Sequence, residues 1–164
     1  SHTFDIQHFV FGTKHRQPTI NYLNREALYR FIWAALTKRG CRLYRVNGIE
    51  DHIHLVVDVN ASYSKSRLMQ DIKSTSSFWM KRCGLFNGFR GWCDGFFSES
   101  KDRNSLDTII NYVKHQELHH KGETFVAELK RFYRSHGLEW NDAGFSDSST
   151  TEASLRDADS NHLF

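Results

Sequence analysis

The spacing of apolar and polar residues predicts four strands and four helices. Residues 4–13 alternate with a period of two, which is typical of a strand whose two faces meet different surroundings. Residues 41–59 predict a strand, a turn at Asn47-Gly48 and a second strand, since Asn-Gly is the strongest short hairpin signal. A fourth, short strand is expected over residues 95–100.

The helices follow from apolar residues that recur every three or four positions. The first is expected to begin after Asn24, whose side chain can cap it, and to stop at Gly40. The second covers residues 64–83 and has one apolar face. A third helix, capped by Asn104 or Ser105, is expected over residues 106–120, and a short fourth over residues 125–136.

This order of elements predicts an α+β fold of the ferredoxin-like split βαβ type. It implies a four-stranded antiparallel sheet with helices on one face and an extra C-terminal helix that bears a tyrosine. The strand at residues 52–58 should be central, and the other face of the sheet should hold any site. Residues 1–142 would form one domain. Residues 143–164 are polar and are expected to form a poorly ordered tail.

Composition narrows the class of protein. A chain of 164 residues with 39% hydrophobic residues can bury a core, so an intrinsically disordered protein is excluded. No apolar run approaches the roughly 20 residues that span a bilayer. Three irregularly spaced cysteines favour reduced thiols in the cytoplasm. The net charge of +3 points only weakly to a polyanionic partner.

Two pairs of residues carry the candidate chemistry. His52 and His54 are two positions apart in a predicted strand, so their imidazoles share one face. Tyr112 and Gln116 are four apart in a predicted helix, so they are neighbours on its surface. Taken singly, each histidine is more simply explained as a surface residue. Tyr112 alone is more simply explained as a residue at the edge of the apolar face of its helix.

Together the four residues predict a metal-assisted attack on a phosphodiester. Two imidazoles and the amide oxygen of Gln116 can bind Mn²⁺ or Mg²⁺, and such a cation stabilises charge at phosphorus. The hydroxyl of Tyr112 would attack, and the nearby cation would favour its phenolate form. The covalent phosphotyrosine keeps the energy of the broken bond, so a DNA strand can be rejoined without ATP.

His52-Ile-His54 followed by Tyr112-x-x-x-Gln116 resembles the single-tyrosine HUH transposases, the small insertion-sequence enzymes that act on single-stranded DNA, including their REP-associated relatives. The stretches HFVFGTKHRQ, NGIEDHIHLVVDV, DIKSTSSFW and GFFSES resemble further segments of that family, and the similarity covers roughly residues 4–142. The tail beyond it does not resemble the family.

The resemblance implies a transposase that binds hairpins, nicks single-stranded DNA, holds a 5′-phosphotyrosine and leaves a free 3′-OH. Tyr112 would be the nucleophile, and His52, His54 and Gln116 would bind the metal. It also implies a homodimer, in which the tyrosine helix of one subunit can complete the site of the other, and a cytoplasmic protein that joins the nucleoid when bound to DNA.

Basic and aromatic residues near the predicted site are candidates for DNA contacts. The cations that would meet phosphates are Lys14, Arg16, Lys73, Lys81, Lys101 and Arg103. Trp92, Phe96 and Phe97 are candidates for stacking on bases, although core packing is the more common role. His115, His119 and His120 suggest a second metal cluster, but His120 points away from His115 on the predicted helix, so surface or DNA-facing positions are expected for them.

Three other functions compete with the transposase. A domesticated relative would bind hairpin DNA without cutting it, although all four chemical residues are present. A replication-initiator-type HUH nicking enzyme often carries a further domain, for which this chain has no room. A histidine phosphodiesterase needs two His-x-Thr/Ser motifs, and no such pair is evident.

Overall fold

A four-stranded antiparallel sheet lies at the centre of the structure, a computed structural model that describes residues 4–138. Its strands are β1 (Ile6–Gly12), β2 (Arg42–Gly48), β3 (His52–Asp58) and β4 (Phe97–Lys101). Their spatial order is β2-β3-β1-β4, which is the ferredoxin-like arrangement. The predicted fold class and the central position of the histidine strand are therefore confirmed.

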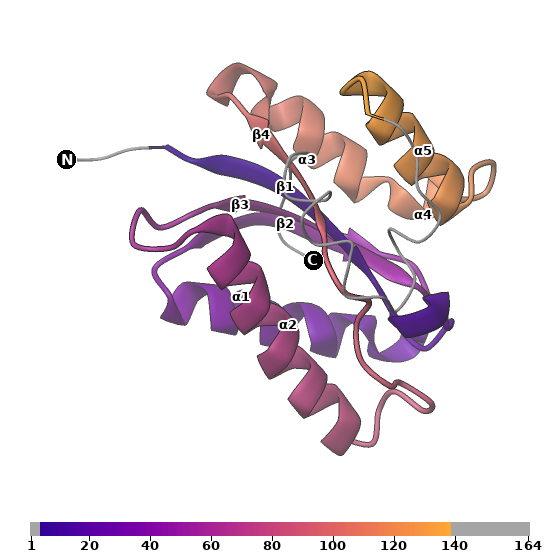
Figure 1. Ribbon diagram of the computed structural model, residues 1–164. Helices are drawn as coiled ribbons and strands as arrows, with labels where there is room; N and C mark the ends of the chain where they lie inside the picture. The colour runs from indigo at the N-terminus through magenta and orange to yellow at the C-terminus, as the bar shows by residue number, and fades with distance from the viewer. Residues whose placement is uncertain (1–3, 139–164) are drawn as a thin grey trace.

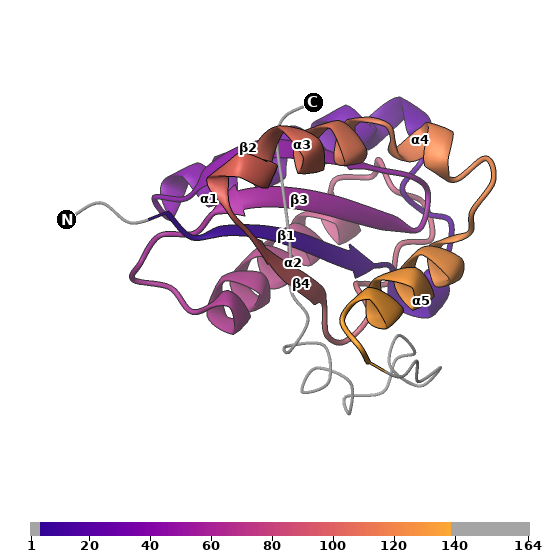
Figure 2. The same ribbon diagram turned by 90° about the horizontal axis from the view of Figure 1, so that it is seen from above.

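Helices cover both faces of this sheet (Figure 1). Helices α1 (Arg25–Lys38) and α2 (Lys65–Arg82) lie on one face. Helices α3 (Leu106–Lys114), α4 (Gln116–His119) and α5 (Phe125–Ser135) lie on the other face, which is turned toward the viewer in Figure 2. Three short 3-10 turns join these elements: η1 (Lys14–Arg16), η2 (Tyr22–Asn24) and η3 (Arg103–Ser105). The face that was expected to hold a site is thus covered by three helices.

Burial on both faces explains the composition of the strands. Every residue of β1 is buried, because its two faces meet two different layers of helices. The larger apolar core joins α1 and α2 to the sheet and includes Trp92 and Phe96. On the opposite face, Phe97 packs with α5. The three aromatic residues considered for base stacking are core residues.

The hairpin turn between β2 and β3 differs from the prediction, and so does the end of α3. Strand β2 runs through Asn47 and Gly48, and the turn falls on residues 49–51. The Asn47 side-chain amide instead donates hydrogen bonds to the carbonyl oxygens of Val113 and Lys114, at 3.1 and 3.0 Å. A continuous helix would use these oxygens internally. The predicted helix over residues 106–120 therefore breaks at His115, and α4 starts anew at Gln116.

Two predicted helix caps have the right position but lack the expected side-chain hydrogen bond. Asn24 and Ser105 occupy the N-cap positions of α1 and α3, but neither side chain makes a capping hydrogen bond. Asn21 and Asp102 cap the 3-10 turns that precede these helices, accepting from Asn24 N and Ser105 N respectively. Each helix therefore begins through a capped 3-10 turn.

The structure also tests the predictions about disulfide bonds and membrane-spanning segments. Cys41, Cys83 and Cys93 form no disulfide bond among the described residues. Within residues 4–138, no helix has the length and apolarity needed to cross a lipid bilayer. The predicted domain end at residue 142 and the tail over 143–164 lie outside the described residues.

Candidate active site

The two histidines of β3 face the layer formed by α3, α4 and α5. Both side chains are fully buried. His52 lies opposite Gly12 of β1, and a Cβ added at Gly12 would come within 2.7 Å of the Phe125 ring. That ring stacks on the His52 imidazole, with centroids 3.8 Å apart and planes 3° from parallel. A glycine at position 12 thus lets α5 approach the sheet and hold His52 in one orientation.

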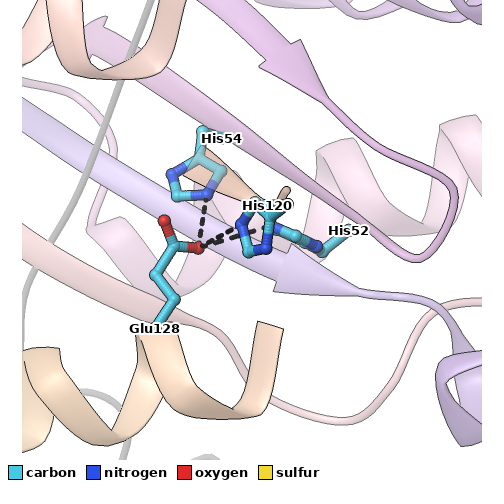
Figure 3. A group of neighbouring side chains, drawn as sticks. All are labelled: His52, His54, His120 and Glu128. Carbon is cyan, nitrogen blue, oxygen red and sulfur yellow. Dashed lines mark hydrogen bonds and ion pairs between the residues drawn. The ribbon is translucent and has the colours of Figure 1, made fainter. Parts of the chain in front are cut away.

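Glu128 of α5 reaches into the centre of the site. Its Oε1 lies 3.1 Å from Nε2 of His54 and 3.1 Å from Nε2 of His120. The same oxygen is 3.4 Å from Nε2 of His52, an ion-pair distance without hydrogen-bond geometry. Figure 3 shows the three imidazoles converging on this one carboxylate. Glu128 is fully buried, so the interaction is not screened by water.

Helix α4 supplies the next layer of contacts. Gln116 is fully buried, its Nε2 donates to Glu128 Oε2 at 3.2 Å, and its Oε1 lies 3.1 Å from His120 Nε2. Of the surface and DNA-facing positions predicted for His120, the surface position is wrong, because only 4% of its side chain is exposed. The break at His115 starts a new turn of helix, from which Gln116 and His120 both reach Glu128.

The tyrosine of α3 completes the group. The hydroxyl of Tyr112 donates a hydrogen bond to Glu128 Oε2, and Arg131 Nη2 donates to the same hydroxyl at 2.8 Å. Arg131 is also paired with Glu123 at 3.0 Å. Tyr112, His52, His54 and Gln116, all selected from the sequence, therefore meet around one carboxylate within a single chain.

Burial and charge shift the pKa values of these groups in different directions. Burial alone lowers the pKa of His52, but the carboxylates of Asp51 and Glu128 outweigh it and raise the pKa to about 9. Burial lowers the pKa of His54 to about 4, against the opposing effect of Glu128. Burial would raise the pKa of Glu128, yet the surrounding imidazoles hold it well below its usual value. Burial and the Glu128 charge raise the pKa of Tyr112, so the phenol keeps its proton.

The raised pKa of His52 predicts how the stability of the metal-free protein depends on pH. The folded state binds this proton more tightly than the unfolded state, whose histidine pKa is about 6.5. The extra stability is fully present below pH 6.5 and is lost as the pH rises through about 9. We expect the free energy of unfolding of metal-free protein to fall by up to about 3 kcal/mol across this range.

Urea titrations at several pH values in the presence of a chelator measure this change. A His52→Asn variant should lack most of the decline. An equally steep decline in that variant would assign it to other groups.

The donor set fits a divalent cation. One ligand atom from each of His52, His54, His120 and Glu128 lies within 4.8 Å of all the others. Among the described residues, His52 Nε2 is buried without a hydrogen-bond partner, and a cation that displaced its proton would satisfy this nitrogen. Asp51 Oδ1 contacts the other ring nitrogen of His52 at 2.8 Å, a common arrangement behind metal-binding histidines.

Glu128 and His120 were missed from the sequence, although a signal existed for each. His120 follows Gln116 by four residues, as Gln116 follows Tyr112, so the three share one helical face by spacing. Glu128 lies within the buried face that Phe125, Leu129 and Phe132 form along α5. An acidic residue on the apolar face of an amphipathic helix needs a buried partner, and here it has several.

The predicted DNA-binding cations fall into two groups. Lys101 lines a hollow of about 380 Å³ beside the Tyr112 side chain, together with Arg131. Arg103 lies nearby in η3, with its guanidinium 4.1 Å above the centre of the Phe4 ring. The other group lies along α2 and the loop after β1, and its Arg16 is exposed.

Lys14, Lys73 and Lys81 line a second hollow, of about 620 Å³, which we call the basic groove. Arg67 and Arg90 complete its five cations, and Asp94 is the one acidic residue among its lining residues. Lys73 is partly engaged, because its ammonium donates to the carbonyl oxygens of Cys93 and Gly95 at 2.7 Å each. The groove begins beside the end of β1, where Gly12 pairs with His52. Lys14 and Gly91 line the groove at this point, and the Lys14 N–H donates a hydrogen bond to Gly91 O.

Known proteins are similar to this chain over most of its length. The family model described as "Transposase IS200 like" matches residues 4–116. Transposases for insertion sequence element IS200 from Salmonella typhimurium and Salmonella typhi are each 25% identical over 114 residues. The match covers 66% of this chain and 74% of each relative.

Solved structures share the fold. A putative transposase from Deinococcus radiodurans superposes with a TM-score of 0.52 at 15% identity, over 71% of this chain and 94% of the other. A REP-associated tyrosine transposase bound to a REP hairpin gives a TM-score of 0.55 at 14% identity, over 73% of this chain and 72% of the other.

Proposed function

Because this chain belongs to the family of IS200-like transposases, we propose that it cuts and rejoins single-stranded DNA near hairpins through a covalent bond to Tyr112. One observation carries the proposal: the Tyr112 hydroxyl and three imidazoles contact the same buried carboxylate, that of Glu128. A tyrosine that served only to pack the core would not need a buried carboxylate and a candidate cation site beside its hydroxyl.

The cleavage step is a transesterification that this arrangement can support. The Tyr112 oxygen forms a bond to phosphorus while the bond from phosphorus to the 3′ oxygen of the preceding nucleotide breaks. Glu128 Oε2, the present hydrogen-bond acceptor of the hydroxyl, holds it in place, and the phenol proton is released to water as the new bond forms. The leaving oxygen takes up one proton and becomes a 3′-OH, so no net proton is consumed. Arg131, already bonded to the hydroxyl, is placed to contact the phosphate oxygens.

His52, His54, His120 and Glu128 would hold the cation, with Gln116 as a further ligand through its Oε1. A divalent cation bound there supplies positive charge that stabilises the negative charge developing on the phosphate. A donor set rich in imidazole suits Mn²⁺ better than Mg²⁺, which prefers oxygen ligands and retained waters.

The basic groove and the hollow beside Tyr112 would bind the DNA. Lys14, Arg16, Lys73 and Lys81 on one side and Lys101 and Arg103 on the other would meet phosphates flanking the scissile bond. The related structure bound to a REP hairpin supports a hairpin as the ligand. The full catalytic set lies in one chain, so we propose that the tyrosine acts within its own subunit. A homodimer would then join two complete sites.

The groove gives a prediction that separates DNA binding from chemistry. Replacing both Lys81 and Arg90 with alanine removes two exposed cations of the groove. Hairpin affinity should fall roughly tenfold at 100 mM salt, and the slope of log affinity against log salt should decrease by about 2. Fluorescence anisotropy over a salt series measures both quantities.

Lys38→Ala, an exposed cation of α1 outside this groove, is the control. Cleavage at saturating DNA should be little changed in the double variant. An unchanged salt slope would show that the hairpin binds elsewhere.

The rival function is hairpin binding without cleavage. Incubation with Mn²⁺ and a pool of single-stranded oligonucleotides, each with a fixed hairpin and random flanks, distinguishes the two. The transposase forms a protein–DNA band that survives denaturing electrophoresis. A protein that retains the hairpins but gives no such band with Mn²⁺ or Mg²⁺ is the non-catalytic binder.

A further inference from the structure

His8 of β1 lies directly behind His54 and has no part in the proposed chemistry. Only 1% of it is exposed. It shares a sheet face with His54, since Val10, two residues along β1, is the register partner of His54. Its Nε2 lies 2.7 Å from His54 Nδ1, and the two rings stack at 5.0 Å with planes 17° apart. The Phe97, Tyr112 and Phe132 rings enclose it edge-on.

A short contact between two imidazole nitrogens requires one to donate and the other to accept. If His8 donates from Nε2, His54 carries its own hydrogen on Nε2, directed at Glu128 Oε1. If His54 donates from Nδ1, its Nε2 presents a lone pair to the centre of the cluster. A cation can bind only the second arrangement, because an imidazole binds metal through an unprotonated nitrogen.

We propose that His8 is a positioning residue: when a cation binds, His8 Nε2 accepts the Nδ1 hydrogen of His54, which leaves His54 Nε2 unprotonated toward the cation. Asp51 does the same for His52 from the other side, at 2.8 Å. Both histidines of β3 are thus held by their Nδ1 atoms, and both direct Nε2 at Glu128. The inference rests on the proposed function for its cation, but it concerns binding and not cleavage.

The surroundings of His8 Nδ1 determine which nitrogen of His8 carries the ring hydrogen before and after a cation binds. His8 Nδ1 is buried and has no hydrogen-bond partner in the described part of the chain. A bare lone pair is tolerated there better than an unpaired N–H. The metal-free protein should therefore keep the hydrogen on His8 Nε2, and cation binding should shift it to His8 Nδ1. Neither ring changes its charge in this exchange.

Two variants of matched size test the role. His8→Phe keeps a ring among Phe97, Tyr112 and Phe132 but offers His54 no acceptor. His8→Gln keeps an acceptor oxygen. We expect His8→Phe to bind Mn²⁺ about 10- to 100-fold more weakly than the unaltered protein, the usual range for a lost partner behind a metal-binding histidine. His8→Gln should stay within about threefold of the unaltered protein. Calorimetric titration with Mn²⁺ alone measures all three, without DNA.

A spectroscopic readout on the unaltered protein decides the matter even if His8→Phe fails to fold. NMR of ¹⁵N-labelled histidine rings, with and without diamagnetic Zn²⁺, reports which nitrogen of His8 carries hydrogen. A shift from Nε2 to Nδ1 on adding Zn²⁺ supports the role. An unchanged His8 ring, or Mn²⁺ affinity in His8→Phe equal to that of the unaltered protein, overturns it. Loss of the covalent DNA band alone would contradict the proposed function and leave these results standing.

Discussion

Replacing Tyr112 with phenylalanine is expected to abolish the covalent protein–DNA product and to lower cleavage by at least about a thousandfold. The substitution removes one oxygen atom, the one that would bond to phosphorus. The ring packs partly against the cluster of Ile6, Val56, Ile109 and Val113, and phenylalanine keeps this packing. Hairpin affinity and Mn²⁺ affinity should therefore stay within about threefold of the unaltered protein. Denaturing electrophoresis with end-labelled DNA measures the product.

Tyr44→Phe is the matched control, because Tyr44 packs against the same apolar cluster. It should form the covalent product at the normal rate. A covalent band of undiminished intensity in Tyr112→Phe would show that another residue attacks the DNA, and mass spectrometry of the trapped peptide would identify it.

Replacing Glu128 with glutamine should have the second largest effect. The carboxylate is the shared partner of His54, His120 and Tyr112, and it is fully buried. Without its charge, the phenol loses its anionic hydrogen-bond partner and the cation loses its one anionic ligand. We expect the rate of covalent product formation to fall at least about a hundredfold and Mn²⁺ affinity to fall as well.

The same substitution should destabilise the metal-free protein by about 3 kcal/mol, because it leaves buried imidazoles without their ionic partner. Urea denaturation at pH 6.5 in the presence of a chelator measures the change. Glu117→Gln is the control, since Glu117 is paired with Arg25 at the surface and should cost less than about 1 kcal/mol. Equal stability and activity in Glu128→Gln and Glu117→Gln would remove Glu128 from the account.

The sheet topology could be predicted from the sequence because the patterns that mark strands and helices lie within each element. Period-two alternation marks the opening strand, and helical spacing marks α1 and α2, so the element order alone predicts the ferredoxin-like sheet. The break in α3 was not visible in the same way. It depends on the Asn47 side chain, which comes from β2 and meets Val113 O only in the folded chain, 66 positions away.

The site residues that could be predicted from the sequence are those that lie close to one another along the chain. His52 with His54, and Tyr112 with Gln116, are spaced by the period of their own element. Glu128 is 74 positions from His54, and no local pattern links the two. The His8 contact crosses two strands, so it requires the register of β1 on β3. Non-local contacts of this kind appear only once the layers are assembled.

The central claim is that a divalent cation binds among His52, His54, His120 and Glu128, next to the hydroxyl of Tyr112. Anomalous diffraction from crystals grown with Mn²⁺ tests it most directly. We expect one strong anomalous peak at bonding distance from the Nε2 atoms of these histidines and from Glu128 Oε1. A cluster without a peak in crystals soaked at saturating Mn²⁺, or a peak bound by other residues, would contradict it.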